Sequence, residues 1–453
     1  MEQHHFKNDK ENSRRDFLKK SLLSGLSAPV LGGLGVASAV AAGQEKQEFS
    51  FTTKKYKSID DIYKISPAYE RMRQKNTIFC RWGWDPKYNE PGGRGLSFMT
   101  KWFYMVPNPL VEEPGFGKLE HALENASFAG QNDTTGLSGA GVRNEGIFAD
   151  WDRFTNPKIQ EKYPFKSPKH AAHYIKRAAR FLGADDVGVA PYDERWIYSK
   201  WYDVGKALNK VPGNHEEEAV FPFEIKSVIV TIHEMDKEAM KVPGYLMDAA
   251  AGIGYAKMAE AGHKISVFLN NLGYKAIPAG NDTSMSVPTA IQAGLGEYSR
   301  MGTMIHPKYG SGVRIQKVYT DLAIEPDQPI TFGVQEFCKK CKKCADHCPS
   351  KAISLDEEPG EKPTVDSISS HPGVKKWYHD NEKCFSQWEK FGTGCGICLT
   401  VCPYNKPGTW VHDLSKMVVS VPIGRDIARQ LDDAFGYGNM DNKNLQDFWN
   451  KED

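Results

Sequence analysis

The sequence predicts an α+β fold that ends in a small cysteine-rich domain. Between residues 167 and 330, short runs rich in β-branched residues alternate with helical patterns, which indicates a sheet covered by helices. Eight of the nine cysteines then lie between Cys338 and Cys402, in short lysine-rich turns. With 453 residues, the chain has room for two or three domains.

Five segments differ in composition. They are a leader (1–42), a loop-rich region with scattered tryptophans (43–165), the α/β segment (166–330), the cysteine-rich domain (331–410) and a tail (411–453). The tail includes "GRDIARQLDDAFGYG", which predicts one amphipathic helix. The 58 basic and 57 acidic side chains nearly balance, so the composition gives no sign of a nucleic-acid-binding surface.

The elements of the α/β segment follow from local signals. "SPKHAAHYIKRAARFLG" predicts a helix that has Ser167 as N-cap, Pro168 in its first turn and Gly183 at its end. Strands are expected at "DVGVAP", at "SVIVTIHEM" and at "YKAIPAG".

Two further helices are expected in the same segment. One is long, covers residues 246–272 and ends at Gly273. Its predicted apolar side consists of Ile253, Ile265, Phe268, Leu269 and Leu272. The other is a short helix at "VPTAIQAGLGEYSR", broken by Gly294 and Gly296.

The N-terminus has the pattern of an export signal. Arg14 and Arg15 precede a Gly- and Ala-rich apolar run, and small residues near Ala39 offer a cleavage site. This is typical of a twin-arginine signal peptide, which directs folded proteins across the membrane, so a cofactor can be inserted first. A disordered basic tail is the alternative. The rest of the chain has no apolar run of 18 residues, so we expect no membrane span in the mature protein.

The cysteines form two motifs. The first is C-x2-C-x2-C-x3-C-P and the second is C-x10-C-x2-C-x3-C-P. The first spacing is typical of bacterial [4Fe–4S] ligation, in which the fourth cysteine serves the other cluster. We therefore assign one cluster to Cys338, Cys341, Cys344 and Cys402, and the second to Cys348, Cys384, Cys395 and Cys398.

Disulfides and zinc fit these cysteines less well than iron–sulfur clusters. An odd total and a C-x2-C-x2-C run do not suit a disulfide framework. Zinc sites use paired C-x2-C knuckles rather than three cysteines in seven residues. Cys80 is left over and is expected to be a free or buried thiol. The lysines of the first motif either offset cluster charge or are solvated; they are Lys339, Lys340, Lys342 and Lys343.

Two interlocked clusters transfer single electrons, and the segment before Thr331 must therefore bind the electron acceptor. That segment contains "GYKAIPAGND", "AIQAGLGEYSRMG" and "YGSGVRIQKVYTDL", followed by "FGVQEFCKKCKKCADHCPSKAI" and "CGICLTVCPYNKPGTWVHD". Together with the leader, these stretches resemble the catalytic subunit of respiratory corrinoid-dependent reductive dehalogenases. The resemblance runs from about Ser167 to Gly438 and is much less clear over residues 43–165.

The resemblance implies a nitroreductase-like core that holds a cobalamin-type corrinoid in its base-off form, followed by the ferredoxin-like domain. In agreement with this, the chain has no D-x-H-x-x-G motif to supply a histidine to cobalt. His233, His263 and His306 are accordingly expected to be core or surface residues, as are the histidines of "SPKHAAH".

The resemblance also implies three catalytic residues: Tyr255, Asn281 and Arg314. Reductive dehalogenation needs two electrons and one proton and releases halide. A tyrosine is a proton donor at neutral pH, and a permanently charged guanidinium nearby would stabilise the tyrosinate that is left. Asn281 would orient the substrate or the phenol. Taken singly, the three would be an ordinary core tyrosine, a turn residue and a surface arginine.

Corrinoid contacts are expected at Gly280, Ser286, Gly294, Gly296 and Gly302, because glycine-rich turns let a backbone approach a planar ligand. Ordinary turn glycines are the alternative. Trp388 resembles an aromatic residue of the substrate pocket in relatives. Gly394 stands where some relatives have a tyrosine, which suggests a wider or differently shaped site.

Two other functions fit part of this pattern. An epoxyqueuosine reductase-like enzyme also combines a corrinoid with two [4Fe–4S] clusters, but export and the balanced charge argue against a tRNA substrate. The other is a non-catalytic electron-transfer subunit, for which the first 330 residues would be unexplained. A non-respiratory dehalogenase would usually lack the leader and often carry a fused reductase module.

We expect a peripheral protein on the outer face of the cytoplasmic membrane or in the periplasm. The resemblance implies a small membrane-anchor partner and a quinol- or ferredoxin-linked electron donor. A homodimer is compatible with the sequence. The substrate is a halogenated small molecule, and chlorinated ethenes, ethanes, methanes and aromatics all remain open.

Overall fold

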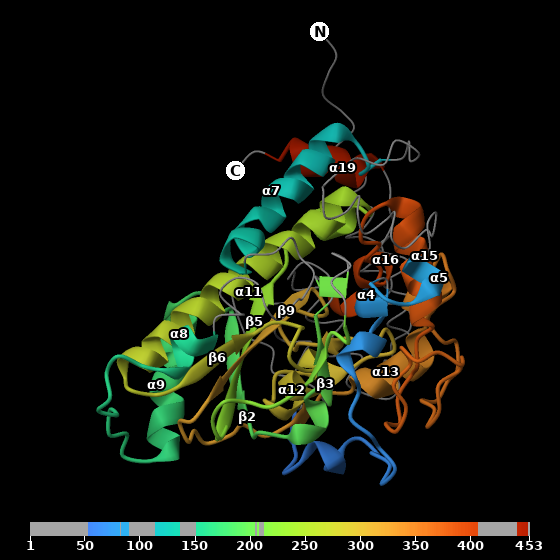
Figure 1. The fold of residues 1–453 in the computed structure, drawn as a ribbon. Helices are drawn as coiled ribbons and strands as arrows, with labels where there is room; N and C mark the ends of the chain where they lie inside the picture. Colours follow the sequence, from blue (N-terminus) through green and yellow to red (C-terminus); the bar gives the residue numbers. More distant parts are fainter. Residues whose placement is uncertain are drawn as a thin grey trace, which may run out of the picture. The chain divides into compact units, whose positions relative to one another are not determined.

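Figure 1 shows a computed structural model of the chain, of which residues 53–81, 83–89, 114–135, 151–203, 206–207, 213–405 and 442–451 are described. Residues Phe51–Asp453 form one compact unit. The predicted leader and the predicted helix at "GRDIARQLDDAFGYG" lie outside the described residues. Among the described residues, no helix has the length and apolarity needed to cross a membrane.

A four-stranded antiparallel sheet lies at the centre of this unit. Its order is β2 (Asp186–Ala190), β5 (Ser227–Glu234), β9 (Val313–Thr320) and β6 (Ala276–Ala279). The three strands expected from the sequence are confirmed as β2, β5 and β6. The inner strand β9 is an addition to these expectations, because "VRIQKVYT" places Arg, Gln and Lys inside the sheet.

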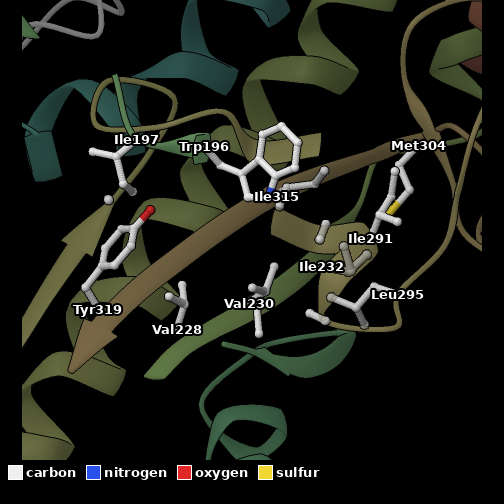
Figure 2. Packing of buried hydrophobic residues seen from close by; sticks show 14 of the residues in the cluster. Trp196, Ile197, Val228, Val230, Ile232, Ile291, Leu295, Met304, Ile315 and Tyr319 are labelled. Atoms are coloured by element: carbon white, nitrogen blue, oxygen red, sulfur yellow. The ribbon is translucent and has the colours of Figure 1, made fainter. Parts of the chain in front are cut away.

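Helices and loops cover both faces of this sheet. On one face, Ile229 of β5 and Val318 of β9 pack against α9 (Pro168–Phe181) and α11 (Tyr245–Asn271). On the other face, Val228, Val230 and Ile232 pack against α12 (Ser286–Gln292). Trp196 and Ile197 belong to the same cluster (Figure 2). Burial on both faces explains the continuous apolar run of β5.

The end signals of α9 are confirmed. The Ser167 side chain accepts a hydrogen bond from the His170 backbone N–H at 3.1 Å, and Pro168 opens the helix. Gly183 follows the helix with a φ of +112°, a value that glycine adopts without strain.

The long helix α11 is confirmed, but its predicted apolar side is only partly right. Ile265 and Leu269 are buried, whereas Ile253 is 42% exposed. Around Ile253, α11 packs through small residues instead. An added Cβ at Gly252 would lie 2.1 Å from Ser127 Oγ of α7 (Lys118–Thr135), so the two helices approach too closely there for a side chain.

The short helix α12 ends at Gln292, which agrees with the break predicted at Gly294 and Gly296; the residues from there to Arg300 are not helical. Residues Glu297–Tyr298 (β7) and Met304–Ile305 (β8) pair as an antiparallel hairpin instead. Gly294, with a φ of +70°, ends the helix. We call residues 297–305 the β7–β8 hairpin.

The N-terminal part of the unit contains short elements. They are β1 (Lys54–Lys55), η1 (Ile59–Asp61), η2 (Gln74–Asn76), α4 (Ile78–Arg81) and α5 (Pro86–Asn89). Strand β1 pairs with β10 (Ile330–Thr331), and buried Arg81 donates to Glu382 at 2.7 Å. This region therefore contacts the cysteine-rich part of the chain.

Further short elements surround the sheet: α8 (Trp151–Thr155), η3 (Glu194–Trp196), β3 (Lys200–Tyr202) paired with β4 (Glu216–Glu218), and η4 (Ala239–Lys241). The cysteine-rich part contains α13 (Val334–Cys341), α14 (Lys343–Asp346), α15 (Asn381–Phe391), α16 (Ile397–Thr400) and η5 (Pro403–Asn405). Helix α19 (Asn442–Trp449) is the last described element.

Candidate functional site

Tyr255 and Arg314 meet between α11 and the sheet. The Arg314 guanidinium carbon lies 4.4 Å from the centre of the Tyr255 ring, and Arg314 Nη1 lies 3.5 Å from the phenol oxygen. An added Cβ at Gly254 would lie 2.8 Å from Arg314 Cγ, so a side chain at that position would displace the arginine. This small residue lets β9 bring a cation against the α11 tyrosine.

Asn281 completes the predicted trio. It follows edge strand β6, and its Nδ2 donates a hydrogen bond to Tyr255 Oη at 3.0 Å. The phenol oxygen thus accepts from Asn281 and lies beside Arg314, while its own proton is used by neither contact. The structure brings the three predicted residues together, although they come from a helix, a turn and a strand.

Lys317 supports this arrangement from the other face of the sheet. It is fully buried in β9, and its Nζ donates to the Ser284 carbonyl at 3.1 Å and to Ser286 Oγ at 2.7 Å. Ser286 Oγ in turn donates to Asn281 Oδ1 at 2.8 Å. A chain of hydrogen bonds therefore runs from Lys317 around the end of β6 to the Tyr255 oxygen.

Each residue in this series of hydrogen bonds donates to the next one toward Tyr255: Lys317 to Ser286, Ser286 to Asn281, and Asn281 to the phenol oxygen. Such an arrangement favours negative charge on the phenol oxygen. Burial lowers the pKa of Lys317 to about 7, and the nearby Asp282 carboxylate opposes that shift. Sequence reasoning missed Lys317. The one signal that could have revealed it is a lysine among apolar residues in "VRIQKVYT".

The eight motif cysteines lie near one another, and their assignment to two clusters stays a prediction that the interactions below support. Burial raises the pKa of the Cys338 thiol, and the neighbouring thiols Cys344, Cys341 and Cys402 raise it further. Burial likewise raises the pKa of the Cys384 thiol to about 12, with contributions from Cys395 and Cys348.

Burial raises the pKa of the Cys398 thiol, and the neighbouring thiols Cys384, Cys395 and Cys348 raise it further. All nine cysteines are free thiols. Thiols grouped in this way suit a cluster that binds thiolates. Among the described residues, no three His, Cys, Asp or Glu side chains are placed to hold one metal ion.

Cys80 stands apart from both groups. It lies on α4 and is buried, and burial raises the pKa of its thiol to about 11. It therefore stays protonated at neutral pH, which agrees with the expectation of a buried thiol.

The β7–β8 hairpin holds the first cysteine motif. The buried Glu297 carboxylate accepts hydrogen bonds from the backbone N–H groups of Phe332, Val334 and Gln335, at the start of α13. Gly302 has a φ of +78°, and an added Cβ there would lie 2.6 Å from the His379 ring. Sequence reasoning did not assign Glu297 a role.

The remaining predicted positions lie in ordinary protein packing. An added Cβ would lie 2.5 Å from the Gln328 carbonyl oxygen at Gly294, and 2.3 Å from the Ile305 carbonyl oxygen at Gly296. Gly280 directly follows β6, between that strand and Asn281. Contacts within the protein thus account for Gly294, Gly296 and Gly302, and their role in corrinoid binding stays a prediction.

Trp388 lies on α15, with its ring 5.5 Å from that of Phe79. Its place in a substrate pocket stays a prediction. The space beside Gly394 is filled, because an added Cβ would lie 2.3 Å from Asp248 Oδ1. The missing tyrosine therefore does not by itself leave a wider site.

Two of the histidines have partners in the core, as expected. His233 is fully buried and lies 2.9 Å from Thr231 Oγ1, and His306 Nε2 lies 3.1 Å from Asp186 Oδ2.

A double-cluster domain joined to an α+β core with a tyrosine–arginine–asparagine centre defines an iron–sulfur oxidoreductase. The family of 4Fe-4S double cluster binding domains matches residues 337–405. The tetrachloroethene reductive dehalogenase of Dehalobacter restrictus is 33% identical, over 97% of this chain and 98% of its own length. The chain belongs to the reductive dehalogenase family, whose members are oxidoreductases acting on carbon–halogen bonds.

The fold is confirmed by a solved reductive dehalogenase described for B12-dependent dehalogenation. It has a TM-score of 0.61 and 21% identity over 87% of this chain, and this chain spans about half (49%) of that longer protein. The expectation of two [4Fe–4S] clusters is confirmed by the family match, and that of a corrinoid agrees with this relative. Epoxyqueuosine reductase of Lactococcus garvieae matches only 33% of this chain, so this alternative is less supported.

Proposed function

We propose that this reductive dehalogenase removes halide from a small chlorinated alkene, with Tyr255 as the proton donor. The observation that carries the proposal is the contact of the Tyr255 oxygen with Asn281 and Arg314. The similarity to a tetrachloroethene reductive dehalogenase over nearly its whole length supports the substrate class.

The three residues have separate tasks. Tyr255 gives its proton to the carbon that loses halide, because neither Asn281 nor Arg314 occupies that proton. Arg314 stabilises the tyrosinate, since its guanidinium stays charged and lies against the ring. Asn281 fixes the phenol and is exposed, so its amide can also meet a substrate.

The exposure of the trio supports a corrinoid site beside it. Tyr255 of α11 and Arg314 of β9 are half-buried, and Asn281 in the turn after β6 is exposed. Both predicted corrinoid contacts Gly280 and Ser286 lie next to Asn281. Gly280 precedes it in the sequence, and Ser286 donates a hydrogen bond to its side chain. When bound, the reduced corrinoid supplies the electrons for cleavage of the carbon–halogen bond, and the clusters deliver electrons to it.

The decisive experiment is a halide-release assay with reduced methyl viologen as donor. The panel contains chlorinated ethenes, ethanes, methanes and halogenated phenols. We expect chloride from the ethenes, and a loss of about 100-fold or more in Tyr255→Phe with clusters and corrinoid retained. Tyr174→Phe, an exposed tyrosine of α9, is the matched control.

The two parts of the proposal fail separately. Halide release from the other compounds but not from ethenes would overturn the substrate class alone. Activity in Tyr255→Phe equal to that of the parent would refute the proton-donor role alone.

We propose further that the enzyme is exported by the twin-arginine pathway and works at the outer face of the cytoplasmic membrane. Arg14, Arg15 and the small residues near Ala39 support this. A small membrane-anchor subunit and a quinol- or ferredoxin-linked donor would complete an organohalide respiratory system. Replacing both arginines by lysine should leave an unprocessed precursor in the cytoplasm, and normal export of that variant would contradict the assignment.

A further inference from the structure

A buried arginine lies beside the first cluster motif. Arg300 is located in the turn of the β7–β8 hairpin, and its side chain is fully buried. Its Nε and Nη2 donate to the Cys338 carbonyl at 3.0 and 2.9 Å, and its Nη1 donates to the Ser354 carbonyl at 2.7 Å. The guanidinium is therefore held by three hydrogen bonds on the backbone of the motif.

Two aromatic residues fix the position of this turn. The Arg300 guanidinium carbon lies 4.7 Å from the centre of the buried Trp377 ring. His379 Nε2 donates to the Arg300 backbone carbonyl at 2.9 Å, and burial lowers the pKa of His379 to about 4, so the ring is neutral. The charge at this position therefore comes from the arginine.

Arg300 lies beside the thiols assigned to the first cluster. Its guanidinium interacts electrostatically with Cys338, Cys344 and Cys341, and its backbone N–H donates a hydrogen bond to the Cys338 thiol. An arginine stays protonated in proteins, so this positive charge is permanent.

The lysines of the same motif are placed differently. Lys339 and Lys340 form ion pairs with Glu358 and Glu357 near the surface, at 2.8 and 2.9 Å. Water and a carboxylate partner screen such charges. Lys343 is buried as well, so Arg300 is one of two buried basic side chains near this motif.

We propose that Arg300 is a positioning residue for electron transfer, whose buried charge raises the reduction potential of the cluster bound by Cys338, Cys341, Cys344 and Cys402. One-electron reduction adds negative charge to a cluster that already carries four thiolates. A cation held in low dielectric stabilises the reduced form more than the oxidised form. The electron comes from an external low-potential donor, and no proton moves.

The test is a redox titration of the holoenzyme followed by electron paramagnetic resonance, with reduced viologens as mediators. Cys341→Ser first identifies the signal of this cluster. Arg300→Gln keeps a polar group at the site but removes the charge. It should change the one-electron equilibrium constant of this cluster at least tenfold toward the oxidised form, which corresponds to 59 mV. The second cluster is the internal reference and should not shift.

Two more variants separate charge from packing. Arg300→Lys keeps the charge, so the one-electron equilibrium constant of this cluster should stay within threefold of its value in the parent. Lys340→Gln removes an exposed charge from the same motif and should have no effect. An unchanged potential in Arg300→Gln with full iron content overturns the proposal, and so do equal potentials in Arg300→Gln and Arg300→Lys.

If Arg300→Gln loses iron, the proposal can still be tested. In that case the comparison rests on Arg300→Lys, because a tenfold drop in that charge-preserving variant contradicts the proposal. These readouts are independent of the organic substrate, so they stand or fall separately from the proposed chlorinated alkene.

Discussion

The guanidinium carbon of Arg314 lies 4.4 Å from the centre of the Tyr255 ring, and its Nη1 lies 3.5 Å from the phenol oxygen. In this position the guanidinium can stabilise negative charge on the phenol oxygen. Asn281 holds the oxygen from another side. The tyrosine is thus fixed by two donors while its own proton remains available.

Removal of the Arg314 charge should slow proton donation. For Arg314→Gln we expect kcat for halide release to fall about 100-fold, the usual scale for loss of one electrostatic stabiliser. Arg314→Lys should lie between this variant and the parent, because a lysine keeps the charge but not the planar contact. Arg180→Gln, in an exposed ion pair of α9, is the control. An unchanged kcat in Arg314→Gln at equal cofactor content would contradict this role.

The hydrogen bond from Ser286 to Asn281 should matter only through Tyr255. Ser286→Ala removes the link between Lys317 and Asn281, and we expect several-fold slower halide release. In a Tyr255→Phe background the same change should have no further effect, because coupled residues are not additive. Halide release is compared at equal corrinoid content, and additive losses in the double variant would contradict an effect through Tyr255.

Lys317 should make stability depend on pH. Burial lowers its pKa from 10.5 to about 7. Between these values the unfolded chain binds the proton and the folded chain does not, so this group adds stability as pH rises through that window. Lys317→Met removes the effect, so its stability relative to the parent should fall from pH 7 toward pH 10, by at most about 1.4 kcal/mol per unit.

Denaturant unfolding of the parent and of Lys317→Met between pH 6 and 10 measures this difference. Loss of the hydrogen bonds to Ser284 and Ser286 adds a constant offset, so the slope is the informative quantity. Lys226→Met, which changes an exposed lysine, should give a flat difference. A flat difference for Lys317→Met would show that the lysine is charged in the folded as well as in the unfolded state.

Neighbouring cysteines should serve different clusters. Cys344→Ser and Cys402→Ser are expected to alter one electron paramagnetic resonance signal, and Cys348→Ser and Cys395→Ser the other. The reason is that the thiols group by position in space rather than by sequence. Spectra and iron content of the four variants check this. Cys344→Ser and Cys348→Ser with the same altered signal would contradict the assignment.

Local signals in the sequence are sufficient for much of the core. The N-cap at Ser167, the apolar run of β5 and the helix-ending Gly273 each depend on neighbours in sequence, and these elements are confirmed. The trio follows from a resemblance, since nothing local to Tyr255 shows that Arg314 will reach it. The prediction for Ile253 is wrong because the buried side of α11 there is made of small residues.

Other features depend on distant partners and leave no local trace. Strand β9 contains Lys317, whose burial requires Ser284 and Ser286 as acceptors. The β7–β8 hairpin is not predicted from the sequence, because strand pairing is not visible in so short a segment. Arg300 resembles any surface arginine until the Cys338 carbonyl is seen beside it.

The β7–β8 hairpin precedes the cysteine-rich domain in sequence, yet Glu297 binds the start of α13 and Arg300 binds the Cys338 carbonyl. The iron–sulfur domain is therefore not a separable cassette. A fragment cut at Thr331 would leave both side chains behind, with three backbone N–H groups and two carbonyls without their partners. Transplanting this domain between dehalogenases would require carrying the hairpin along with it.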